Sequence, residues 1–458
     1  MSEHGDSLTK SEILRAMSEG GGRVYFIGVG GVSMRSLFCL CRHFGIMASG
    51  SDRRTDDFIN SLILSGEDIV IGERESLPPD TGLIVYSHAI GREHPERILG
   101  RKAGIPEASR DKLLGALMGC YEGRIGVSGS HGKSTVTAMI AKIFIDCDKS
   151  PTVLSGASLY GGRLPFVIGS LDYLIYEGCE YKDSFLSFSP SVSVFLNMEL
   201  DHTDYFKNIE RLSESFLLAM KRAEKIIVNA DDARLLSLAI TSGVKTVTFG
   251  KAQFADYRYE RVKDGRGGLS FRLFHKEREL CIINLGMLGE FNISNAAAAI
   301  ATAVEEGVDF TRAVASLTEF HGIERRLECI GDYTGRGLYY DYAHHPTEIR
   351  ESILALREKG AVTVIFRPHT YSRTADLLSG FISSLSLADY VIMLDIDAVR
   401  EENVFGISSE QVAKEIGGIY CPSEDMLPSL LEKTAGSIVL MGAGELENAK
   451  KLLTKEKE

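Results

Sequence analysis

The stretch RIGVSGSHGKSTVTAMIAKIF at residues 124–144 decides the fold of this chain. A strand-like run, Arg124–Val127, leads into a glycine loop, and the loop leads into the helical run Thr135–Phe144. A strand that passes through glycines into a helix brings backbone N–H groups and the helix N-terminus to one point, where a phosphate can bind. The stretch therefore predicts a parallel α/β domain with a nucleotide-phosphate site.

Each position of this loop has a physical role. Gly129 and Gly132 let the backbone curl around phosphate oxygens, and Lys133 brings a positive charge to the β- and γ-phosphates. Ser134 offers a hydroxyl to Mg²⁺. The strict G-x-x-x-x-G-K-[ST] pattern needs glycine at 127, where the chain has Val127, but the core G-x-x-G-K-S is intact. A glycine-rich turn with an exposed lysine and no ligand is the alternative.

A second glycine turn lies near the start of the chain. The strand-like run Val24–Ile27 leads into Gly28-Val29-Gly30-Gly31, and the next such run ends close to Ser51 and Asp52. The glycines leave room for a phosphate against the backbone, and Asp52 can accept hydrogen bonds from a ribose. The dinucleotide fingerprint needs glycine where this chain has Ser33. The turn therefore leaves three interpretations open: a nicotinamide or flavin cofactor, another nucleotide, or a tight turn without a ligand.

Polar residues follow two further predicted strands. Glu180 comes after Tyr173–Tyr176, and His202 comes after Val192–Leu196. The carboxyl ends of parallel strands share one edge of a sheet, so both side chains are expected near the phosphate loop. A carboxylate and an imidazole can hold a divalent ion that neutralises phosphate charge. We predict Ser134, Glu180 and His202 as ligands of Mg²⁺ or Mn²⁺; a solvated polar loop is the alternative.

Two segments in the last third of the chain also end strands and open helices. Asp341 is suited to a ribose hydroxyl, whereas His344, His369 and Arg373 are suited to an anionic substrate. Arg373 would grip a carboxylate or phosphate with two parallel hydrogen bonds. The paired histidines 344 and 345 have no further ligands at zinc spacing. Polar surface loops without a ligand are the alternative.

The 458 residues are too many for one ordinary core and predict about three domains. Short β-branched runs alternate with amphipathic helical stretches, which is typical of parallel α/β architecture. The middle block carries a β-rich insert over 246–285 and an alanine-rich helix, Ile293–Ala303. In the third block, Ala375–Leu385 is expected as one helix, and Ser408-x-x-Gln411 as a capping box.

Composition narrows the choice of partners. With 51 basic and 63 acidic residues, the net charge of −12 argues against nucleic acid or an anionic membrane as the main partner. No run of about 18 apolar residues occurs, and the first residues lack the apolar stretch of a signal peptide. Eight cysteines without a C-x-x-C pair fit a reducing compartment. We expect a cytoplasmic protein, monomeric or homodimeric, that acts on small molecules.

Taken in order, the motifs resemble those of the Mur ligase family along nearly the whole chain. Each is modest alone, but ten in one order with family-like spacing are specific. They are G-x-G-G-x-x-M (28–34), G-S-H-G-K-S-T (129–135), C-E-Y…S-F-L (179–186), N-x-E-x-D-H-x-D (197–204), N-x-x-N-A-A-A-A (292–299), G-x-x-R-R (322–326), D-Y-x-H-H-P-T-E (341–348), P-H-x-Y-x-R-T (368–374), A-x-R-E (398–401) and G-A-G (442–444).

The resemblance implies three α/β domains. A Rossmann-like domain at 1–118 would hold a UDP-sugar. A central P-loop ATPase-like domain at 119–322, with a parallel sheet and a small β-rich insert, would hold ATP and Mg²⁺. A Rossmann-like C-terminal ligase domain at 323–458 would close over both and help to bind an amino acid.

The resemblance also implies an ATP-dependent amide ligase of peptidoglycan synthesis that joins L-alanine to UDP-N-acetylmuramate. The lactyl carboxylate would attack the γ-phosphate, and the amine of L-alanine would attack the resulting acyl phosphate. The implied catalytic residues are Lys133, Glu180, His202, His344 and Arg373. The implied ATP contacts are Gly129, Ser130, His131, Gly132, Lys133, Ser134, Thr135, Asn292, Asn295, Arg326 and Asp341. The implied UDP-sugar contacts are Gly28, Gly30, Gly31, Ser51, Asp52 and His369.

Three positions depart from the family pattern. Ser33 replaces a usual glycine, and Phe291 replaces a histidine common before the first asparagine of N-x-x-N. Ser134 stands where threonine is usual, which keeps the hydroxyl. Of these, Phe291 is the change expected to alter contacts near ATP.

Three other functions compete with alanine addition. A sister ligase that attaches a whole recycled peptide would have a similar glycine turn and similar residues around Arg400. A nicotinamide-dependent oxidoreductase would use the first glycine turn, but it has no need of Lys133 in a second phosphate loop. A non-catalytic nucleotide-binding regulator would tolerate the loss of Glu180 or His202, and both are present.

Overall fold

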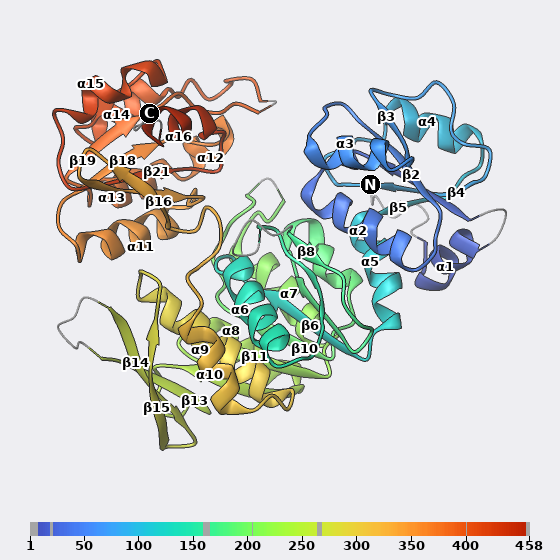
Figure 1. Cartoon of the computed structure of the whole chain (residues 1–458), viewed down its shortest axis with the longest axis horizontal. Helices are drawn as coiled ribbons and strands as arrows, with labels where there is room; N and C mark the ends of the chain where they lie inside the picture. The colour runs from blue at the N-terminus through green and yellow to red at the C-terminus, as the bar shows by residue number, and fades with distance from the viewer. Residues whose placement is uncertain are drawn as a thin grey trace. The chain divides into compact units, whose positions relative to one another are not determined.

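The computed structural model describes residues 8–18, 22–158, 165–203, 205–262, 268–399 and 401–454. Asp204 and Arg400, which belong to two of the quoted motifs, lie outside these ranges. The chain forms two compact units, one of residues 1–247 and 305–308, the other of residues 248–304 and 309–458 (Figure 1). Within the described ranges, none of the helices has both the length and the apolar character needed to cross a membrane.

The first unit begins with a parallel five-stranded sheet in the order β3-β2-β1-β4-β5. Its strands are β1 (Arg23–Ile27), β2 (Ala48–Asp52), β3 (Asp68–Ile71), β4 (Thr81–Tyr86) and β5 (Glu107–Ser109). Its helices are α1 (Lys10–Ser18), α2 (Val32–His43), α3 (Asp57–Leu64), α4 (Pro95–Lys102) and α5 (Arg110–Leu117). The strand order reverses between β1 and β4, which places the first glycine turn, after β1, at the switch point where such sheets bind ligands.

This unit also contains six neighbouring strands of a ten-stranded sheet, in the order β11-β10-β6-β9-β7-β8. Its strands are β6 (Gly123–Ser128), β7 (Thr152–Leu154), β8 (Phe166–Val167), β9 (Tyr173–Glu177), β10 (Val192–Phe195) and β11 (Lys225–Asn229). Its helical segments are η1 (Met118–Cys120), α6 (Lys133–Asp146), η2 (Tyr181–Ser187), α7 (Ile209–Met220) and α8 (Ala233–Ser242). β6 pairs in parallel with β9 and β10, so the loops after all three strands meet at one edge, as the sequence predicted.

The second unit opens with the β-rich insert. The chain enters it within β12 (Lys245–Gly250) and continues through β13 (Tyr257–Val262), β14 (Leu269–His275) and β15 (Arg278–Leu285). β13, β14 and β15 are antiparallel neighbours. The helices α9 (Phe291–Glu305) and α10 (Phe310–Thr318) follow. Sequence reasoning missed β13, because the run YRYERV carries three charged side chains.

A six-stranded sheet in the order β16-β17-β21-β18-β19-β20 completes the second unit. Its strands are β16 (Glu328–Tyr333), β17 (Arg336–Asp341), β18 (Val362–Phe366), β19 (Tyr390–Met393), β20 (Ile419–Tyr420) and β21 (Ser437–Met441). Its helices are α11 (Pro346–Arg357), α12 (Tyr371–Asp376), α13 (Leu378–Leu385), α14 (Ser409–Glu415), η3 (Glu424–Met426), α15 (Leu427–Leu431) and α16 (Glu447–Thr454). Within the described part of this sheet, β16 and β17 pair in antiparallel fashion and the other neighbouring strands pair in parallel.

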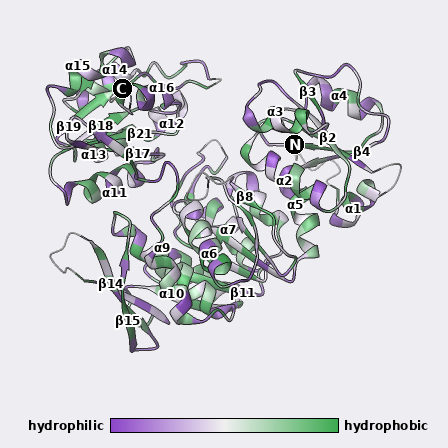
Figure 2. Cartoon of the chain, viewed as in Figure 1, coloured by the Kyte–Doolittle hydropathy of each residue, from purple (hydrophilic) through white to green (hydrophobic). Residues whose placement is uncertain are grey.

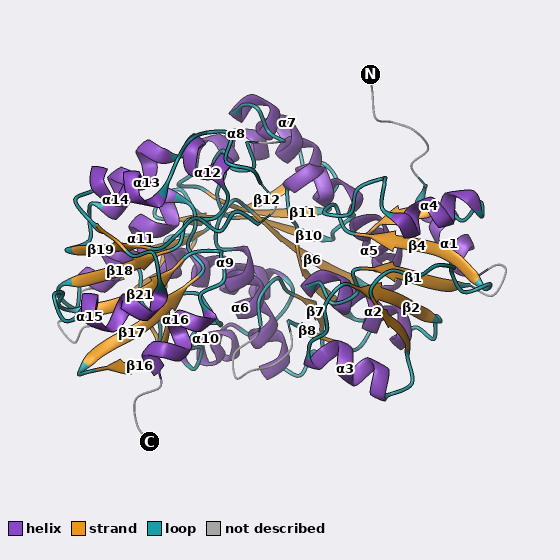
Figure 3. Ribbon diagram, turned by 90° about the horizontal axis from the view of Figure 1, so that it is seen from above, coloured by secondary structure: helices purple, strands orange, loops and turns teal. Residues whose placement is uncertain are grey.

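Two apolar clusters cover the two faces of this last sheet. Val364 and Phe366 pack with residues of α11, α13 and α14, whereas Ile365 packs with residues of α15 and α16. Figure 3 shows α11, α13 and α14 on one side of the sheet and α15 and α16 on the other. Alternate residues of β18 thus face opposite helices, as the two-residue period of a strand requires. β18 and β19 are hydrophobic along most of their length (Figure 2), which is typical of strands buried on both faces.

The predicted helix over 375–385 is wrong in one respect, because two helices occupy this region. α12 begins four residues earlier, where the Thr370 hydroxyl accepts a hydrogen bond from the Arg373 N–H. Leu377 then leaves helical geometry at φ −107° and ψ 14°, and α13 starts after it. The predicted capping box of Ser408 and Gln411 is confirmed at the start of α14.

The β14–β15 hairpin offers a test of backbone strain. Its two-residue turn consists of Lys276 and Glu277, which both have positive φ, 48° and 69°. Turns of this kind favour Asn-Gly, because the backbone of most other residues is strained at positive φ. We expect the double change Lys276→Asn and Glu277→Gly to raise the free energy of unfolding by about 1 kcal/mol in urea titrations. Ala-Ala at the same positions is the control, and a gain equal to that of Asn-Gly would contradict the prediction.

Candidate active site

The phosphate loop has the predicted geometry between β6 and α6. Gly132 is the N-cap of α6 with φ 83°, and Gly129 has φ 147°. A Cβ on Gly129 would lie 3.1 Å from the Leu196 side chain and 3.2 Å from the Asn197 backbone. Glycine is therefore required at Gly129 by backbone conformation and by close packing against the chain after β10.

Lys133, the first residue of α6, forms an ion pair with Glu180. The Lys133 Nζ lies 3.1 Å from Glu180 Oε2 and 3.3 Å from Oε1, and Glu180 is only 2% exposed. Burial alone would lower the pKa of Lys133, but the negative charges of Glu180 and its neighbours outweigh burial and raise this pKa to about 12. The ammonium group therefore stays charged at physiological pH, which is the state that can stabilise a phosphate.

His202 lies beside the same carboxylate. Its Nε2 is 3.9 Å from Glu180 Oε1 and 3.9 Å from Asp201 Oδ2, and its ring lies against Tyr181 with centroids 4.6 Å apart. The His202 backbone has φ 54°, in the left-handed region that costs a residue with a side chain about 1–3 kcal/mol. The fold thus holds an imidazole in a strained position next to the ion pair of the phosphate loop.

This strain gives a prediction with two variants. His202→Gly removes both the imidazole and the backbone strain, whereas His202→Ala removes only the imidazole. The glycine variant should therefore unfold with a free energy about 1 kcal/mol higher than the alanine variant. If His202 helps to hold a divalent ion, both variants should need about 10-fold more Mg²⁺ for half-maximal turnover. Urea titration checks the stability and Mg²⁺ titration checks the role in ion binding. An alanine variant as stable as the glycine variant would contradict the predicted backbone strain at position 202.

Residues that sequence reasoning did not select brace the phosphate loop. The Asn197 side chain accepts a hydrogen bond from the His131 N–H at 2.8 Å and donates to the His131 carbonyl at 3.1 Å. The Ser130 hydroxyl donates to the Glu199 carbonyl at 2.9 Å and accepts from the Glu199 N–H at 2.8 Å. Both Asn197 and Glu199 belong to the quoted N-x-E-x-D-H-x-D motif, so the signal for them was present. They bind the loop itself and would hold it in shape.

Asp183 is a further residue that sequence reasoning missed. It has φ 57° and accepts hydrogen bonds from the Tyr205 hydroxyl at 2.5 Å, the Arg211 guanidinium at 2.6 Å and the Ser215 hydroxyl. These contacts fix η2, the segment that follows Glu180, to α7 and to the chain before it. No local pattern in the sequence marks such a role, because the partners lie 22 to 32 positions away.

The first glycine turn is closed by the residues expected to bind a ribose. Asp52 Oδ2 accepts a hydrogen bond from the Gly30 N–H at 2.8 Å, and a Cβ on Gly30 would lie 2.9 Å from the same oxygen. The Ser51 hydroxyl donates to Glu96 at 2.6 Å. Glu96 is fully buried and also accepts from the Tyr25 hydroxyl at 2.6 Å. Ser51 and Asp52 thus shape the turn, and their contact with a UDP-sugar stays a prediction.

The predicted ATP residues of the second unit form two small clusters. Asn295 donates to the Asn292 side chain at 2.9 Å, and both are buried at the start of α9. Asp341, at the end of β17, is 4% exposed and accepts from the Ser352 hydroxyl. Burial raises the pKa of Asp341 to about 6, although Ser352 and the charge of Arg326 oppose the shift. A carboxyl group so placed is tuned by its surroundings, which is common at functional sites.

Glu348 organises the loop between β17 and α11. It accepts hydrogen bonds from the backbone N–H groups of His344 and His345, at 3.1 Å and 3.4 Å, and lies 3.5 Å from Arg326. His345 caps α11, so the second histidine of the motif has a structural role. The capping arrangement leaves His344 on the loop before the helix.

His369 and Arg373 lie one strand further along the sheet. The Nδ1 atom of His369 is buried and has no hydrogen-bond partner among the described residues. Burial and the neighbouring charge of Arg373 lower the pKa of His369. The imidazole is therefore expected to be neutral, with one nitrogen left to a ligand. Next to them, Glu401 accepts from the Ser372 N–H at 2.9 Å and from its hydroxyl at 2.6 Å.

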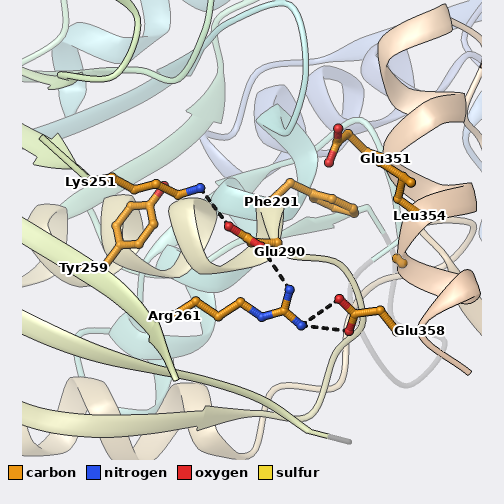
Figure 4. Close-up of a pocket in the computed structure, with 9 residues that line it drawn as sticks. Lys251, Tyr259, Arg261, Glu290, Phe291, Glu351, Leu354 and Glu358 are labelled. Carbon is orange, nitrogen blue, oxygen red and sulfur yellow. Dashed lines mark hydrogen bonds and ion pairs between the residues drawn. The ribbon is translucent and has the colours of Figure 1, made fainter. Parts of the chain in front are cut away.

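A cavity of about 450 Å³ in the second unit is lined by β13, α11 and the start of α9 (Figure 4). Arg261 donates to Glu290 at 3.0 Å and to both oxygens of Glu358, at 2.7 Å and 2.8 Å. Lys251 donates to Glu290 at 2.7 Å, and this contact is the main cause of the lowered pKa of Glu290. Phe291, the departure from the family pattern, lines the same cavity. These charges tie the insert to Glu358, the C-cap of α11.

Family models match the chain in three consecutive parts. "Mur ligase family, catalytic domain" matches residues 23–121, "Mur ligase middle domain" matches 127–303, and "Mur ligase, glutamate ligase domain" matches 325–444. A protein of Caldicellulosiruptor saccharolyticus named UDP-N-acetylmuramate–L-alanine ligase is 37% identical, with 94% of this chain and 98% of the relative aligned. A protein of Aquifex aeolicus with the same name is 35% identical over 93% and 95% of the two chains.

Solved structures share the fold. UDP-N-acetylmuramate-alanine ligase of Thermotoga maritima superposes with a TM-score of 0.79 at 22% identity, over 94% of this chain and 98% of the other. A murein peptide ligase of Psychrobacter arcticus gives a TM-score of 0.69 at 23% identity, also over 94% and 98%. The predicted three-domain α/β fold is thereby confirmed.

Proposed function

Because the chain belongs to the Mur ligase family, we propose that it is an ATP-dependent ligase that joins L-alanine to UDP-N-acetylmuramate in peptidoglycan synthesis. The observation that carries the proposal is the arrangement after β6, β9 and β10, where Lys133, Glu180 and His202 lie together. Such a set suits phosphoryl transfer from ATP, which depends on positioning and on stabilisation of charge. The names of relatives at 34–37% identity support the choice of substrates.

The reaction would proceed in two steps. An oxygen of the lactyl carboxylate forms a bond to the γ-phosphorus while the bond from that phosphorus to ADP breaks. The unprotonated amine of L-alanine then attacks the acyl carbon. The tetrahedral intermediate releases phosphate, and the nitrogen loses a proton, which leaves the amide. Lys133 would stabilise the negative charge of the γ-phosphoryl group during its transfer to the carboxylate.

The residues near the phosphate loop fit a divalent ion. Glu180 Oε1 and His202 Nε2 lie 3.9 Å apart, and Ser134 follows Lys133 in the first turn of α6. A hydroxyl and a carboxylate are the oxygen donors that Mg²⁺ takes beside phosphate oxygens and water. The ion would neutralise phosphate charge. We propose Ser134, Glu180 and His202 as its holders, with Mn²⁺ as an alternative ion because of the imidazole.

The remaining assignments are proposed with the same function. The P-loop residues 129–135, with Asn292, Asn295, Arg326 and Asp341, would bind ATP. The first glycine turn, with Ser51, Asp52 and His369, would bind the UDP-sugar. His344 and Arg373 would act on the substrate side. The proposed domains are 1–118, 119–322 and 323–458.

Phosphate release from ATP and Mg²⁺ tests the function. We expect release only when UDP-N-acetylmuramate and L-alanine are both present. Release that needs a murein peptide instead of L-alanine would identify a recycling ligase. Absence of release with every amine would overturn the proposal of a ligase.

A further inference from the structure

The first unit contains a cavity of about 220 Å³ that reaches Lys133. One wall is α2, the helix after the first glycine turn, with Ser33, Ser36 and Leu37. Another is α5, with Arg110 and Leu114, and the remaining walls come from the last residues of β7 and β9 and the chain that follows each strand. The cavity therefore reaches the first turns of the two helices that follow the glycine turns, the places proposed for the uridine diphosphate and for ATP.

The charged side chains that line this cavity differ in whether they have a hydrogen-bonding or ionic partner. Lys133 is paired with Glu180 at 3.1 Å. Glu177 accepts hydrogen bonds from the Ser155 hydroxyl and the Gly156 N–H, at 3.1 Å and 2.5 Å. The Arg110 side chain, by contrast, forms no hydrogen bond or ion pair with any residue in the described part of the chain, and it is half-buried. A half-buried guanidinium without a counter-ion is suited to an anionic ligand.

The first turn of α5 is held firmly next to this arginine. Asp111 is 4% exposed, accepts from the Ser187 hydroxyl at 2.5 Å and lies 3.1 Å from His88 Nε2. Further along the helix, a Cβ on Gly115 would lie 2.3 Å from the Ser187 carbonyl. α5 is thus packed closely against η2, the segment that follows Glu180. The backbone of Arg110 is thereby fixed before any ligand arrives, which lowers the entropic cost of binding.

We propose that Arg110 binds the carboxylate of the acid substrate and aims it at the phosphate held by Lys133. The inference rests on the proposed function and adds a residue that touches the substrate. A guanidinium can hold a carboxylate by two parallel hydrogen bonds, and this fixes the direction of the attacking oxygen. Arg110 recognises the carboxylate and not the nucleotide, so it selects an acid-bearing sugar over one without the acid.

The test compares two nucleotide sugars that differ in this acid. UDP-N-acetylmuramate carries the lactyl carboxylate, and UDP-N-acetylglucosamine does not. Calorimetry without ATP or alanine should show that Arg110→Met weakens binding of the first by about 10- to 100-fold and leaves binding of the second unchanged. Arg110→Lys should recover part of the lost affinity, because lysine restores the positive charge but cannot form the two parallel hydrogen bonds of a guanidinium. Unchanged binding of the second sugar also shows that the variant is folded.

The matched control is Lys112→Ala, which removes a positive charge two residues further along α5 and outside the cavity. It should leave both affinities unchanged. Equal losses for both sugars in Arg110→Met would show that Arg110 holds the nucleotide, and no loss for either would show that it holds nothing; both results overturn the inference. If either of these two results is found and the wild type still releases phosphate, the proposed function stands and only the role of Arg110 is overturned. A wild type that binds neither sugar would overturn both proposals.

Discussion

Replacing Lys133 by alanine is expected to slow alanine-dependent phosphate release by about 100- to 1,000-fold, the usual effect of losing one charge-stabilising donor. The ammonium group is charged at physiological pH, and it lies at the start of α6 where a γ-phosphate would sit. The same change leaves Glu180, 2% exposed, without its cation. We therefore also expect a loss of about 3–5 kcal/mol in the free energy of unfolding.

A second variant separates these two effects. The double change Lys133→Ala and Glu180→Gln removes the unpaired charge, so it should recover most of the stability and none of the activity. Lys142→Ala is the control on the same helix, where an exposed ion pair with Asp146 at 2.8 Å contributes little. Turnover by the double variant within 10-fold of the wild type would contradict the role proposed for Lys133.

Asp341→Asn is expected to stabilise the protein at pH 8 by up to about 3 kcal/mol, from a pKa shift of about two units at 1.36 kcal/mol each. The folded-state pKa of Asp341 is about 6, above its ordinary value of 3.8. The folded state therefore holds this proton more tightly than the unfolded state. The contribution of Asp341 to stability is complete below pH 3.8 and declines as pH rises through 6. Asparagine does not titrate, so the advantage of the variant should appear between pH 4 and 6 and stay constant above.

Urea titrations of both proteins at pH 4 and pH 8 measure this difference. Asp425→Asn, at an exposed position in the same unit, is the control and should give no such pH dependence. A variant that is equally stabilised at pH 4 and pH 8 would show that burial of the charge is not the cause. Turnover should fall in the variant if Asp341 binds ATP, so stability and activity would change in opposite directions.

Short motifs predicted the candidate site best where the residues with a chemical role lie in a segment whose backbone conformation also shows in the local sequence. Lys133 and Gly132 were found because the loop, the strand before it and the helix after it all carry local signals. Glu180 and His202 were placed correctly because parallel strands end at one edge of a sheet. The prediction needed only the order of the strands, which the alternation of β and α runs supplies.

Other features depended on residues distant in sequence and could not be read locally. The ion pair of Lys133 and Glu180 joins positions 47 apart, and the buried Asp341 accepts a hydrogen bond from Ser352 in the next helix. The positive φ of His202 follows from the turn in which Tyr205 and Phe206 donate to its carbonyl. The break at Leu377 has no glycine or proline to mark it. In these cases tertiary contacts decide what the local pattern leaves open.

The contacts of Arg261 with Glu358 have a consequence for the history of this chain. The two residues are 97 positions apart, one on a β-strand of the insert and the other at the end of α11, whose first turn begins beside His344. Loss of Glu358 would leave Arg261 with Glu290 alone, and loss of Arg261 would remove the contact between the insert and the end of α11, whereas a joint exchange would preserve this contact. Positions 261 and 358 should therefore co-vary among relatives, and an insert grafted from another member should fit only when both residues are transferred together.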